Sequence, residues 1–340
     1  MNDASIYPLI FEPVFKDYIW GGRNLERLFD RSLPAGIVAE SWEIAGHEDG
    51  TTKVKNGLFA GLPLTAVQDK LGLDLIGTNN TWANERDKFP LLVKLLDANK
   101  PLSVQVHPDD AYALSHEGNE LGKTEMWVVL EATPDAALIL GLQPNTSSEQ
   151  FRQAINDGNL EQFLHRLPIA AGDAVCVPAG TVHAILEGAV IAEIQQNSNT
   201  TYRVYDWNRV GTDGNPRPVH IDKAIDVINF NCVEPGLAKP QLVYEGQGIR
   251  RQELCSNRYF TTERVELEDG AAYEGSCNGS SLEIWGLLQG SAKLLSTHLK
   301  RIQFVLLPAA LGAYTIKAQG KCEFLRTYVS EKTAVNFAES

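Results

Sequence analysis

The stretch Gly172-Asp-Ala-Val-Cys-Val-Pro178-Ala-Gly180-Thr-Val-His183 decides how the fold is interpreted. Its Gly-Asp pair predicts a turn, the next residues predict a short apolar strand, and Pro178 and Gly180 predict a second, tight turn. This turn brings His183 to the start of the following strand, where the imidazole can point into a β-barrel. A lone histidine of this kind is more often a core or turn residue, but the complete spacing favours a histidine with a function.

The rest of the chain is rich in short apolar segments, as expected for a mainly β protein. Its 28 glycines and 16 prolines are spread over 340 residues and separate runs of Val, Ile, Leu, Tyr and Phe. The expected strands include residues 51–54, 91–96, 102–106, 126–130, 137–142, 174–177, 190–195 and 201–207. Apolar spacing and candidate capping residues predict helices at 64–75, 149–164, 108–117 and 219–227. We therefore expect a few helices that decorate a β scaffold.

The acidic composition limits the classes of partner. Asp and Glu number 43 against 30 Lys and Arg, which gives a formal net charge of −13. A field of this sign works against nonspecific binding to nucleic acid or to an anionic membrane, so neither is an expected partner. The apolar runs fall far short of the roughly 20 residues that span a bilayer, and the first residues lack the pattern of a signal peptide. We expect a cytoplasmic protein in which a local cluster of bases holds any anionic ligand.

Two further segments carry polar side chains on one face of a strand. In Leu102-Ser-Val-Gln-Val-His-Pro108, alternation places Ser103, Gln105 and His107 on one face and the two valines on the other. In Gly122-Lys-Thr-Glu-Met-Trp127, the same rule places Lys123 and Glu125 together. Burying an ionised carboxylate such as that of Glu125 costs free energy unless a partner compensates its charge.

Taken together, the polar residues of these segments form a plausible set of metal ligands. Gln105, His107, Glu125 and His183 offer nitrogen and oxygen donors, which suit Zn(II), with Mn, Fe or Co as substitutes. The five cysteines include no Cys-x-x-Cys pair, so a cysteine zinc site is not indicated. Open coordination positions would remain for water or substrate, as in a catalytic site.

The segment from Ile191 to Arg209 is interpreted as a β-hairpin. Glu193 shares a strand face with Gln195, a turn-prone Asn-Ser-Asn follows, and residues 202–207 are expected to return as a strand. A hairpin would bring Glu193 close to Arg203. An outward-facing salt bridge between the two is an equally simple interpretation of these residues.

The segments together resemble a known family. The spacing from Gly172 to His183 is similar to the second signature of the cupins, small double-stranded β-helix (jelly-roll) barrels that often hold a metal. With Phe15-Lys-Asp-Tyr-Ile-Trp-Gly-Gly22, Ala39-Glu-Ser-Trp-Glu-Ile44 and Phe89-Pro-Leu-Leu-Val-Lys-Leu-Leu96, the chain resembles the compact bacterial form of the type I mannose-6-phosphate isomerases. The resemblance covers most of the chain and weakens after about residue 235.

This resemblance implies a function, a cofactor and a set of site residues. It implies an aldose-ketose isomerase of mannose metabolism that interconverts mannose 6-phosphate and fructose 6-phosphate, with one Zn²⁺ per chain and a sugar phosphate as its partner. The implied ligands are Gln105, His107, Glu125 and His183. The implied catalytic residues are Arg203, Glu193 and Lys123, and the implied phosphate-binding residues are Ser103, Lys94 and Arg203. The proton-transferring base is expected to be Glu193, with Lys123 as the fallback, and the sequence leaves a monomer or a homo-oligomer undecided.

The resemblance also implies two cupin-like barrels with small helical additions. Residues 1–234 are expected to form the metal-bearing, catalytic domain, and residues 235–340 a degenerate β domain without a metal, since no histidine stands where a ligand is expected. Three alternatives remain open: a cupin dioxygenase that binds iron, a noncatalytic sugar-binding cupin, and a related isomerase for another sugar or sugar phosphate.

Overall fold

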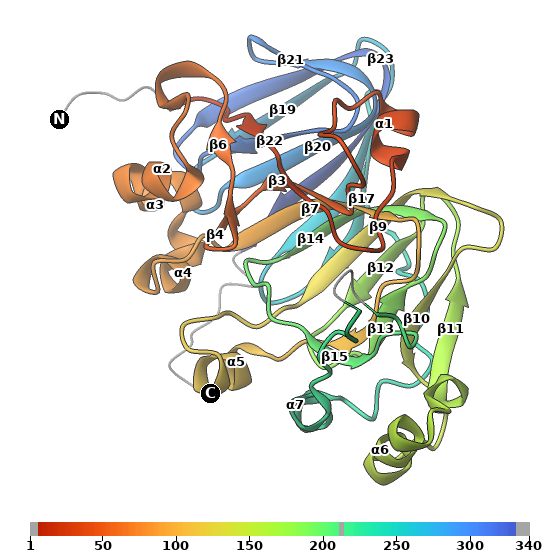
Figure 1. Ribbon diagram of the computed structural model, residues 1–340. Coiled ribbons are helices and arrows are strands. Elements are labelled where there is room, and N and C mark those ends of the chain that lie inside the picture. Colours follow the sequence, from red (N-terminus) through yellow and green to blue (C-terminus); the bar gives the residue numbers. More distant parts are fainter. Residues whose placement is uncertain (1–5, 211–213, 331–340) are drawn as a thin grey trace. The chain divides into compact units, whose positions relative to one another are not determined.

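The computed structural model describes residues 6–210 and 214–330, and it confirms a mainly β protein (Figure 1). The chain divides into two compact units. The first, called the site unit below, comprises residues 15–41 and 94–238, and the second comprises the residues up to 14, residues 42–93 and those from 239 onward. The change of unit after residue 238 lies close to the expected boundary at 234, although residues 42–93 group with the C-terminal part. The division into domains 1–234 and 235–340 stays a prediction.

Two sheets carry the site unit. The five-stranded sheet has the order β11-β10-β13-β8-β15. Its strands are β8 (Val104–Val106), β10 (Ala137–Leu142), β11 (Leu164–Pro168), β13 (His183–Ile185) and β15 (Tyr202–Tyr205). The six-stranded sheet has the order β12-β9-β14-β7-β3-β2. Its strands are β2 (Val14–Lys16), β3 (Glu40–Ile44), β7 (Leu91–Ala98), β9 (Glu125–Ala132), β12 (Ala174–Val177) and β14 (Ala189–Gln196).

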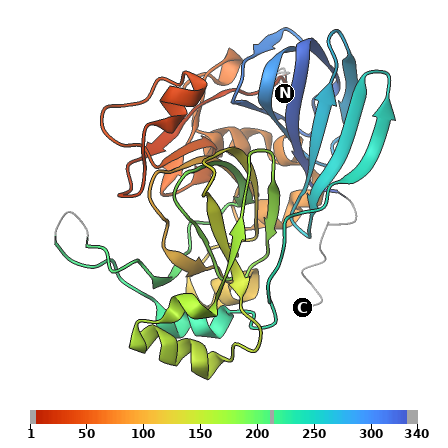
Figure 2. The same cartoon turned by 90° about the vertical axis from the view of Figure 1, so that its right-hand side faces the viewer.

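The two sheets of the site unit face each other (Figures 1 and 2). A buried apolar cluster lies between them. This cluster joins Val129 of β9 to Leu138 and Leu140 of β10. On the opposite face of the five-stranded sheet, Val104 and Val106 belong to a second cluster with residues of two helices. The alternation predicted for residues 102–107 is therefore confirmed, because the valines pack away from the face that carries the polar side chains.

Short helices surround these sheets. They are α1 (Asn24–Phe29), α5 (Asp110–His116), α6 (Ser148–Asp157) and α7 (Ile221–Val227), with a 3-10 turn at η3 (Leu160–Phe163). Ser147 and Gln150 form a capping box at the start of α6. Gly158 ends the helix in the left-handed conformation, with φ +69°. For this reason the helix expected to run to 164 ends at 157 and continues only as the 3-10 turn.

The second unit contains an eight-stranded sheet with the order β16-β17-β18-β23-β20-β21, in which β19 pairs with β23 and β22 with β20. Its strands are β16 (Gln241–Gly246), β17 (Ile249–Ser256), β18 (Thr261–Leu267), β19 (Ala272–Cys277), β20 (Glu283–Leu294), β21 (Thr297–Leu299), β22 (Gln303–Leu307) and β23 (Gly312–Tyr328). Two small ladders pair β1 (Phe11–Glu12) with β6 (Lys53–Val54) and β4 (Gly46–His47) with β5 (Gly50–Thr51). The closure of each half into a cupin barrel stays a prediction.

The helices of the second unit lie between residues 57 and 85. They are α2 (Leu64–Leu71), α3 (Leu73–Ile76) and α4 (Thr81–Glu85), with 3-10 turns at η1 (Gly57–Phe59) and η2 (Thr78–Asn80). The helix expected over 64–75 is split at Gly72, whose φ of +51° and ψ of −125° lie outside the helical region. The apolar pattern predicted one continuous helix because both helices bury residues of the pattern: α2 buries Val67, and α3 buries Leu75.

The interior of the second unit holds a network of charged and aromatic side chains. The buried Glu283 carboxylate accepts hydrogen bonds from Trp285 Nε1 at 2.9 Å and from the Tyr314 hydroxyl at 2.6 Å. Arg326 donates to the same carboxylate through Nε at 2.8 Å and Nη2 at 2.7 Å. A buried carboxylate with four donors is fully satisfied, so this network is a structural element of the unit.

The predicted hairpin at residues 191–209 is wrong. Strand β14 lies between β9 and β7 in the six-stranded sheet, whereas β15 pairs with β8 in the five-stranded sheet. Both edges of β14 are already occupied, so the next segment cannot pair with it. The chain therefore passes from one sheet to the other after residue 196.

The helices are short throughout. In residues 6–210 and 214–330, none combines the length and the apolar character needed to cross a membrane.

Candidate metal centre and active site

Four polar side chains from the two sheets converge in the site unit. Gln105 of β8 and His183 of β13 are register partners, His107 follows β8, and Glu125 begins β9. The ligand atoms of His107, Glu125 and His183 all lie within 4.8 Å of one another, and the three residues are buried. Gln105 Nε2 lies 3.3 Å from His183 Nε2, and a half-turn of the amide would put its oxygen in the same place. The turn before β13 depends on Gly180, which has φ +84° and no room for a side chain beside the Val227 carbonyl.

Backbone carbonyls orient the two imidazoles. His107 Nδ1 lies 2.8 Å from the Thr200 carbonyl oxygen, and His183 Nδ1 lies 2.9 Å from that of Thr181. A carbonyl only accepts, so each Nδ1 carries the proton and each Nε2 keeps its lone pair. The Nε2 atoms face Glu125, at 3.4 Å from His107 and 3.8 Å from His183. Both rings are therefore held with the ligating nitrogen toward the carboxylate.

The charge states of these residues fit a divalent cation. Burial lowers the pKa of His107 and of His183, which favours the neutral imidazole that binds a metal. Burial opposes ionisation of Glu125, but its polar neighbours, led by the Lys123 ammonium, together outweigh burial and lower the pKa of the carboxyl. Two neutral imidazoles, a carboxylate and an amide make a nitrogen and oxygen donor set without sulfur, which suits zinc and its neighbours in the first transition series.

Carboxylates and lysines surround the cluster on one side. Lys123 Nζ lies 2.8 Å from Glu125 Oε1 and 3.2 Å from His107 Nε2. Glu193 of β14 is buried, and its pKa is raised by burial and then by the negative charge of Glu125. Lys94 of β7 lies 3.5 Å from Glu40 Oε2. Burial opposes the charge of Lys94, but the neighbouring carboxylates, led by Glu40, outweigh it and raise the pKa of the lysine.

Arginines gather on the other side of the same cavity. Arg203 of β15 donates through Nε to Ser103 Oγ at 3.3 Å, and through Nη1 to the Pro218 carbonyl at 2.8 Å. Arg217 donates through Nε to Asp206 Oδ2 at 2.8 Å, and Arg209 donates to the Oδ1 atom of this carboxylate at 2.5 Å. Burial and the charge of Arg217 lower the pKa of Arg203. The Arg209 and Arg217 guanidinium groups thus share the Asp206 carboxylate, and Arg203 adds a third positive charge, which leaves an excess of positive charge.

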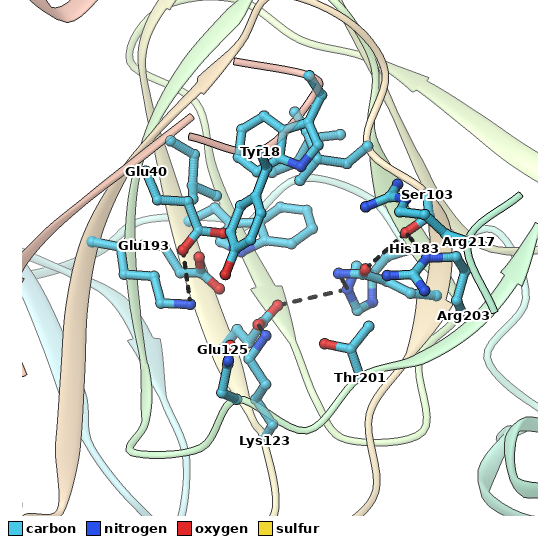
Figure 3. A pocket seen from close by; sticks show the side chains of 18 residues that line it. Tyr18, Glu40, Ser103, Lys123, Glu125, His183, Glu193, Thr201, Arg203 and Arg217 are labelled. Atoms are coloured by element: carbon cyan, nitrogen blue, oxygen red, sulfur yellow. Dashed lines mark hydrogen bonds and ion pairs between the residues drawn. The ribbon is translucent and has the colours of Figure 1, made fainter. Parts of the chain in front are cut away.

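Apart from His107, Asp206 and Arg209, these groups line one cavity of about 280 Å³. Figure 3 shows Glu40 and Glu193 on one side, Ser103, Arg203 and Arg217 on the other, and Glu125 between them. An apolar wall completes the lining and is made of Trp20, Leu96, Leu102, Trp127 and Ile185. The arrangement can hold a cation at its centre, an anion at the arginine side and a proton on the carboxylate side.

The structure brings the predicted site residues together. The cavity is lined by Ser103, Gln105, Lys94, Lys123, Glu125, His183, Glu193 and Arg203, and His107 lies beside Lys123. Their individual roles stay predictions. Sequence reasoning missed Glu40, Trp127 and Arg217. Residues 203–217 contain three arginines although the whole chain is acidic, and this grouping is the signal that could have led to Arg217.

A buried nitrogen and oxygen cluster that opens into a polar cavity is typical of metal-dependent enzymes. Residues 9–128 match the family model described as "Phosphomannose isomerase type I, catalytic domain". The chain belongs to the type I phosphomannose isomerase family.

Individual relatives match over nearly the whole chain. The protein called "Probable mannose-6-phosphate isomerase GmuF" of Bacillus subtilis is 38% identical over 94% of this chain and 98% of its own length. The "Mannose-6-phosphate isomerase" of Streptococcus mutans is 38% identical over 87% of this chain and 95% of its own. Among solved structures, a mannose 6-phosphate isomerase from Bacillus subtilis superimposes with a TM-score of 0.84 at 34% identity, over 94% of this chain and 99% of that one. The family predicted from the sequence is therefore confirmed.

Proposed function

We propose that this protein is a zinc-dependent mannose-6-phosphate isomerase that interconverts D-mannose 6-phosphate and D-fructose 6-phosphate through an enediol or enediolate. The observation that carries the proposal is the shared cavity, in which the buried His107, Glu125 and His183 group lies between a carboxylate side and an arginine side. The carboxylate side would supply the proton-transferring base, and the arginine side would bind the phosphate. The names of the relatives support the choice of sugar.

Gln105, His107, Glu125 and His183 would hold the zinc ion. A zinc ion bound there supplies a Lewis acid that offsets the negative charge developing on the sugar oxygens. Lys123 lies 2.8 Å from the Glu125 carboxylate and lines the same cavity, so its ammonium can donate a proton to the sugar carbonyl oxygen as this oxygen becomes a hydroxyl.

Glu193 is the proposed proton-transferring base. Isomerisation removes the proton from C2 of the aldose and returns one to C1 of the ketose, so one group must both accept and donate. Burial and the charge of Glu125 raise the pKa of Glu193, which makes its carboxylate a stronger base than an exposed one. Lys94, with Glu40, lies on the same side of the cavity, and we propose that its charge holds the Glu193 carboxylate in place.

The arginine side is the proposed phosphate site. Ser103 and Arg203 are hydrogen-bonded to each other, and Arg217 adds a second guanidinium that lines the cavity. Arginine binds phosphate through paired N–H donors, and the local excess of positive charge overcomes the negative field of the whole chain. Lys94, which the resemblance also assigns to the phosphate, is occupied by carboxylates, so we place the phosphate with the arginines. Arg203, which lines the cavity, is also proposed to stabilise the enediolate oxygens.

The proposal is tested by an assay that couples fructose 6-phosphate formation to a chromogenic reaction, on protein stripped with a chelator and after zinc is added back. Activity that disappears with the metal and returns with zinc is the expected result. Zinc-loaded protein without activity on mannose 6-phosphate would refute the choice of substrate. Activity restored by iron alone, with consumption of oxygen, would favour a dioxygenase instead.

A further inference from the structure

Thr201 directly precedes β15, the strand that carries Arg203. The two residues are two positions apart, so their side chains share one face, while Tyr202 between them packs into the apolar cluster on the opposite face. Thr201 and Arg203 both line the cavity, and both are only partly buried. The Thr201 side chain is therefore within reach of a molecule that enters the cavity.

The pairing of β15 with β8 places Thr201 beside the candidate metal centre. Arg203 is the register partner of Gln105 in an antiparallel ladder, so two steps along each chain bring Thr201 opposite His107. The two main chains stay close at this point, because the Thr200 carbonyl oxygen lies 2.8 Å from His107 Nδ1. Side chains that stand opposite each other on one face are neighbours. Thr201 thus lies next to the metal centre and on the same face as Arg203.

The Thr201 hydroxyl is available to a ligand. Among the described residues of the chain, no group forms a hydrogen bond with it. Figure 3 shows its oxygen on the side of the Thr201 residue that faces Lys123 and Glu125, toward the interior of the cavity. A hydroxyl donates one hydrogen bond and accepts others, so it is suited to a sugar hydroxyl, which does the same.

We propose that Thr201 is a specificity-determining residue whose hydroxyl forms a hydrogen bond with the hydroxyl on C3 or C4 of the sugar. This inference rests on the proposed function, which places C1 and C2 at the metal centre and the phosphate of C6 with the arginines. The C3 and C4 hydroxyls lie between these two ends of the substrate. A sugar without a hydroxyl in the right direction at that carbon loses the hydrogen bond and is selected against.

The test combines Thr201→Val, which keeps the shape of the side chain and removes the hydroxyl, with the 3-deoxy and 4-deoxy analogues of mannose 6-phosphate. Thr201→Val should lower kcat/KM for mannose 6-phosphate about three- to tenfold, the size of one neutral hydrogen bond. With the analogue that lacks the partner oxygen, the wild type and the variant should have equal kcat/KM, because the interaction is already absent. An analogue that is not turned over is compared through its inhibition constant as a competitive inhibitor. Thr201→Ser, which keeps the hydroxyl, should retain most of the wild-type kcat/KM.

Thr146→Val is the matched control. The Thr146 hydroxyl donates to the Gln143 carbonyl oxygen at 2.8 Å, and neither residue lines the cavity. This variant should lower the urea midpoint and leave kcat/KM unchanged, because it removes a hydrogen bond of the folded protein. Thr201→Val should keep the wild-type urea midpoint and its bound zinc, because the hydroxyl is assigned to the substrate.

Three results would overturn the inference. A Thr201→Val protein with the wild-type kcat/KM for mannose 6-phosphate would show that the hydroxyl does not contact the sugar. Equal losses on mannose 6-phosphate and on both deoxy analogues would exclude C3 and C4 as its partners. Loss of zinc from the variant would assign the hydroxyl to the metal centre.

The wild-type protein separates the inference from the proposed function. In each of these three cases, isomerisation of mannose 6-phosphate by the zinc-loaded wild type would leave the proposed function standing. Zinc-loaded wild type that does not isomerise mannose 6-phosphate would overturn the proposed function, and the inference with it.

Discussion

Replacing Arg217 with alanine should weaken binding of the phosphorylated sugar without a comparable loss of turnover. The guanidinium lines the cavity and is fixed by Asp206, so it reaches a phosphate without first being ordered. A hydrogen bond to a charged group contributes about 1.5–3 kcal/mol, which corresponds to a factor of about 10 to 150 in binding. The Arg217 side chain is 23% exposed, so solvent screens part of its charge. We therefore expect KM to rise by about 10- to 30-fold.

The assay is a steady-state measurement of kcat and KM for mannose 6-phosphate on zinc-loaded protein, and Arg209→Ala is the matched control. Both arginines donate to the Asp206 carboxylate, so both variants remove one of its partners. Of these two arginines, Arg217 lines the cavity and Arg209 does not. The control should change KM by no more than about threefold, a size typical of a surface ion pair of up to about 1 kcal/mol.

Two results would refute the reasoning. Equal increases in KM for the two variants would mean that the effect comes from the loss of a partner at Asp206 and that Arg217 does not contact the phosphate. A fall in kcat with an unchanged KM would place Arg217 among the groups that act on the transition state. Arg217→Lys should give an intermediate KM, because it keeps the charge and loses the paired donors.

Three other predictions concern the base, the second unit and the response to acid. Glu193→Gln should abolish exchange of the C2 hydrogen of the substrate with labelled solvent while the bound zinc stays at one ion per chain; exchange at the wild-type rate would assign the base to another group. Glu283→Gln should lower the free energy of unfolding by about 3–5 kcal/mol, because it leaves Arg326, whose side chain is only 13% exposed, without its main partner. Glu274→Gln, at an exposed carboxylate, should cost less than about 1 kcal/mol. Similar denaturation midpoints for the two variants would contradict this. Burial opposes ionisation of Asp206, but the arginines around it outweigh burial and lower the pKa of the carboxyl below the ordinary value of 3.8. The ionised carboxylate therefore stabilises the folded protein above about pH 3.8, and this contribution is lost as the pH falls through the lower pKa of the folded state. The difference in stability between the wild type and Asp206→Asn should therefore shrink below about pH 4, and a constant difference from pH 6 to pH 2 would exclude this linkage.

Local patterns in the sequence predicted which polar side chains come together at the candidate metal centre. Alternation along a strand is a property of a few consecutive residues, so it correctly placed Ser103 and Gln105 on the cavity face and Lys123 beside Glu125. The spacing from Gly172 to His183 is also local, because one turn and one strand carry the histidine to its position.

Strand pairing and the remaining cavity residues depend on contacts that are distant in the sequence. The turn-prone residues after Gln196 looked like a hairpin turn, but a turn pattern does not reveal whether the preceding strand still has a free edge. Strand β14 has none, because β9 and β7 occupy both sides. Glu40 reaches Lys94 across 54 positions of the chain, and no periodicity connects two such residues. Gly72 interrupts the predicted helix through its backbone angles, which apolar spacing does not report.

The use of backbone carbonyls to orient His107 and His183 has a consequence for how the protein tolerates mutation. Every residue type carries a carbonyl, so Thr181 and Thr200 can be exchanged without loss of either hydrogen bond as long as the main chain keeps its path. Thr201, whose side chain lines the cavity, directly follows one of them. A library that randomises positions 200 and 201 should therefore change the shape of the cavity while zinc affinity stays constant. Selection for new sugars can act at these positions separately from selection for the metal.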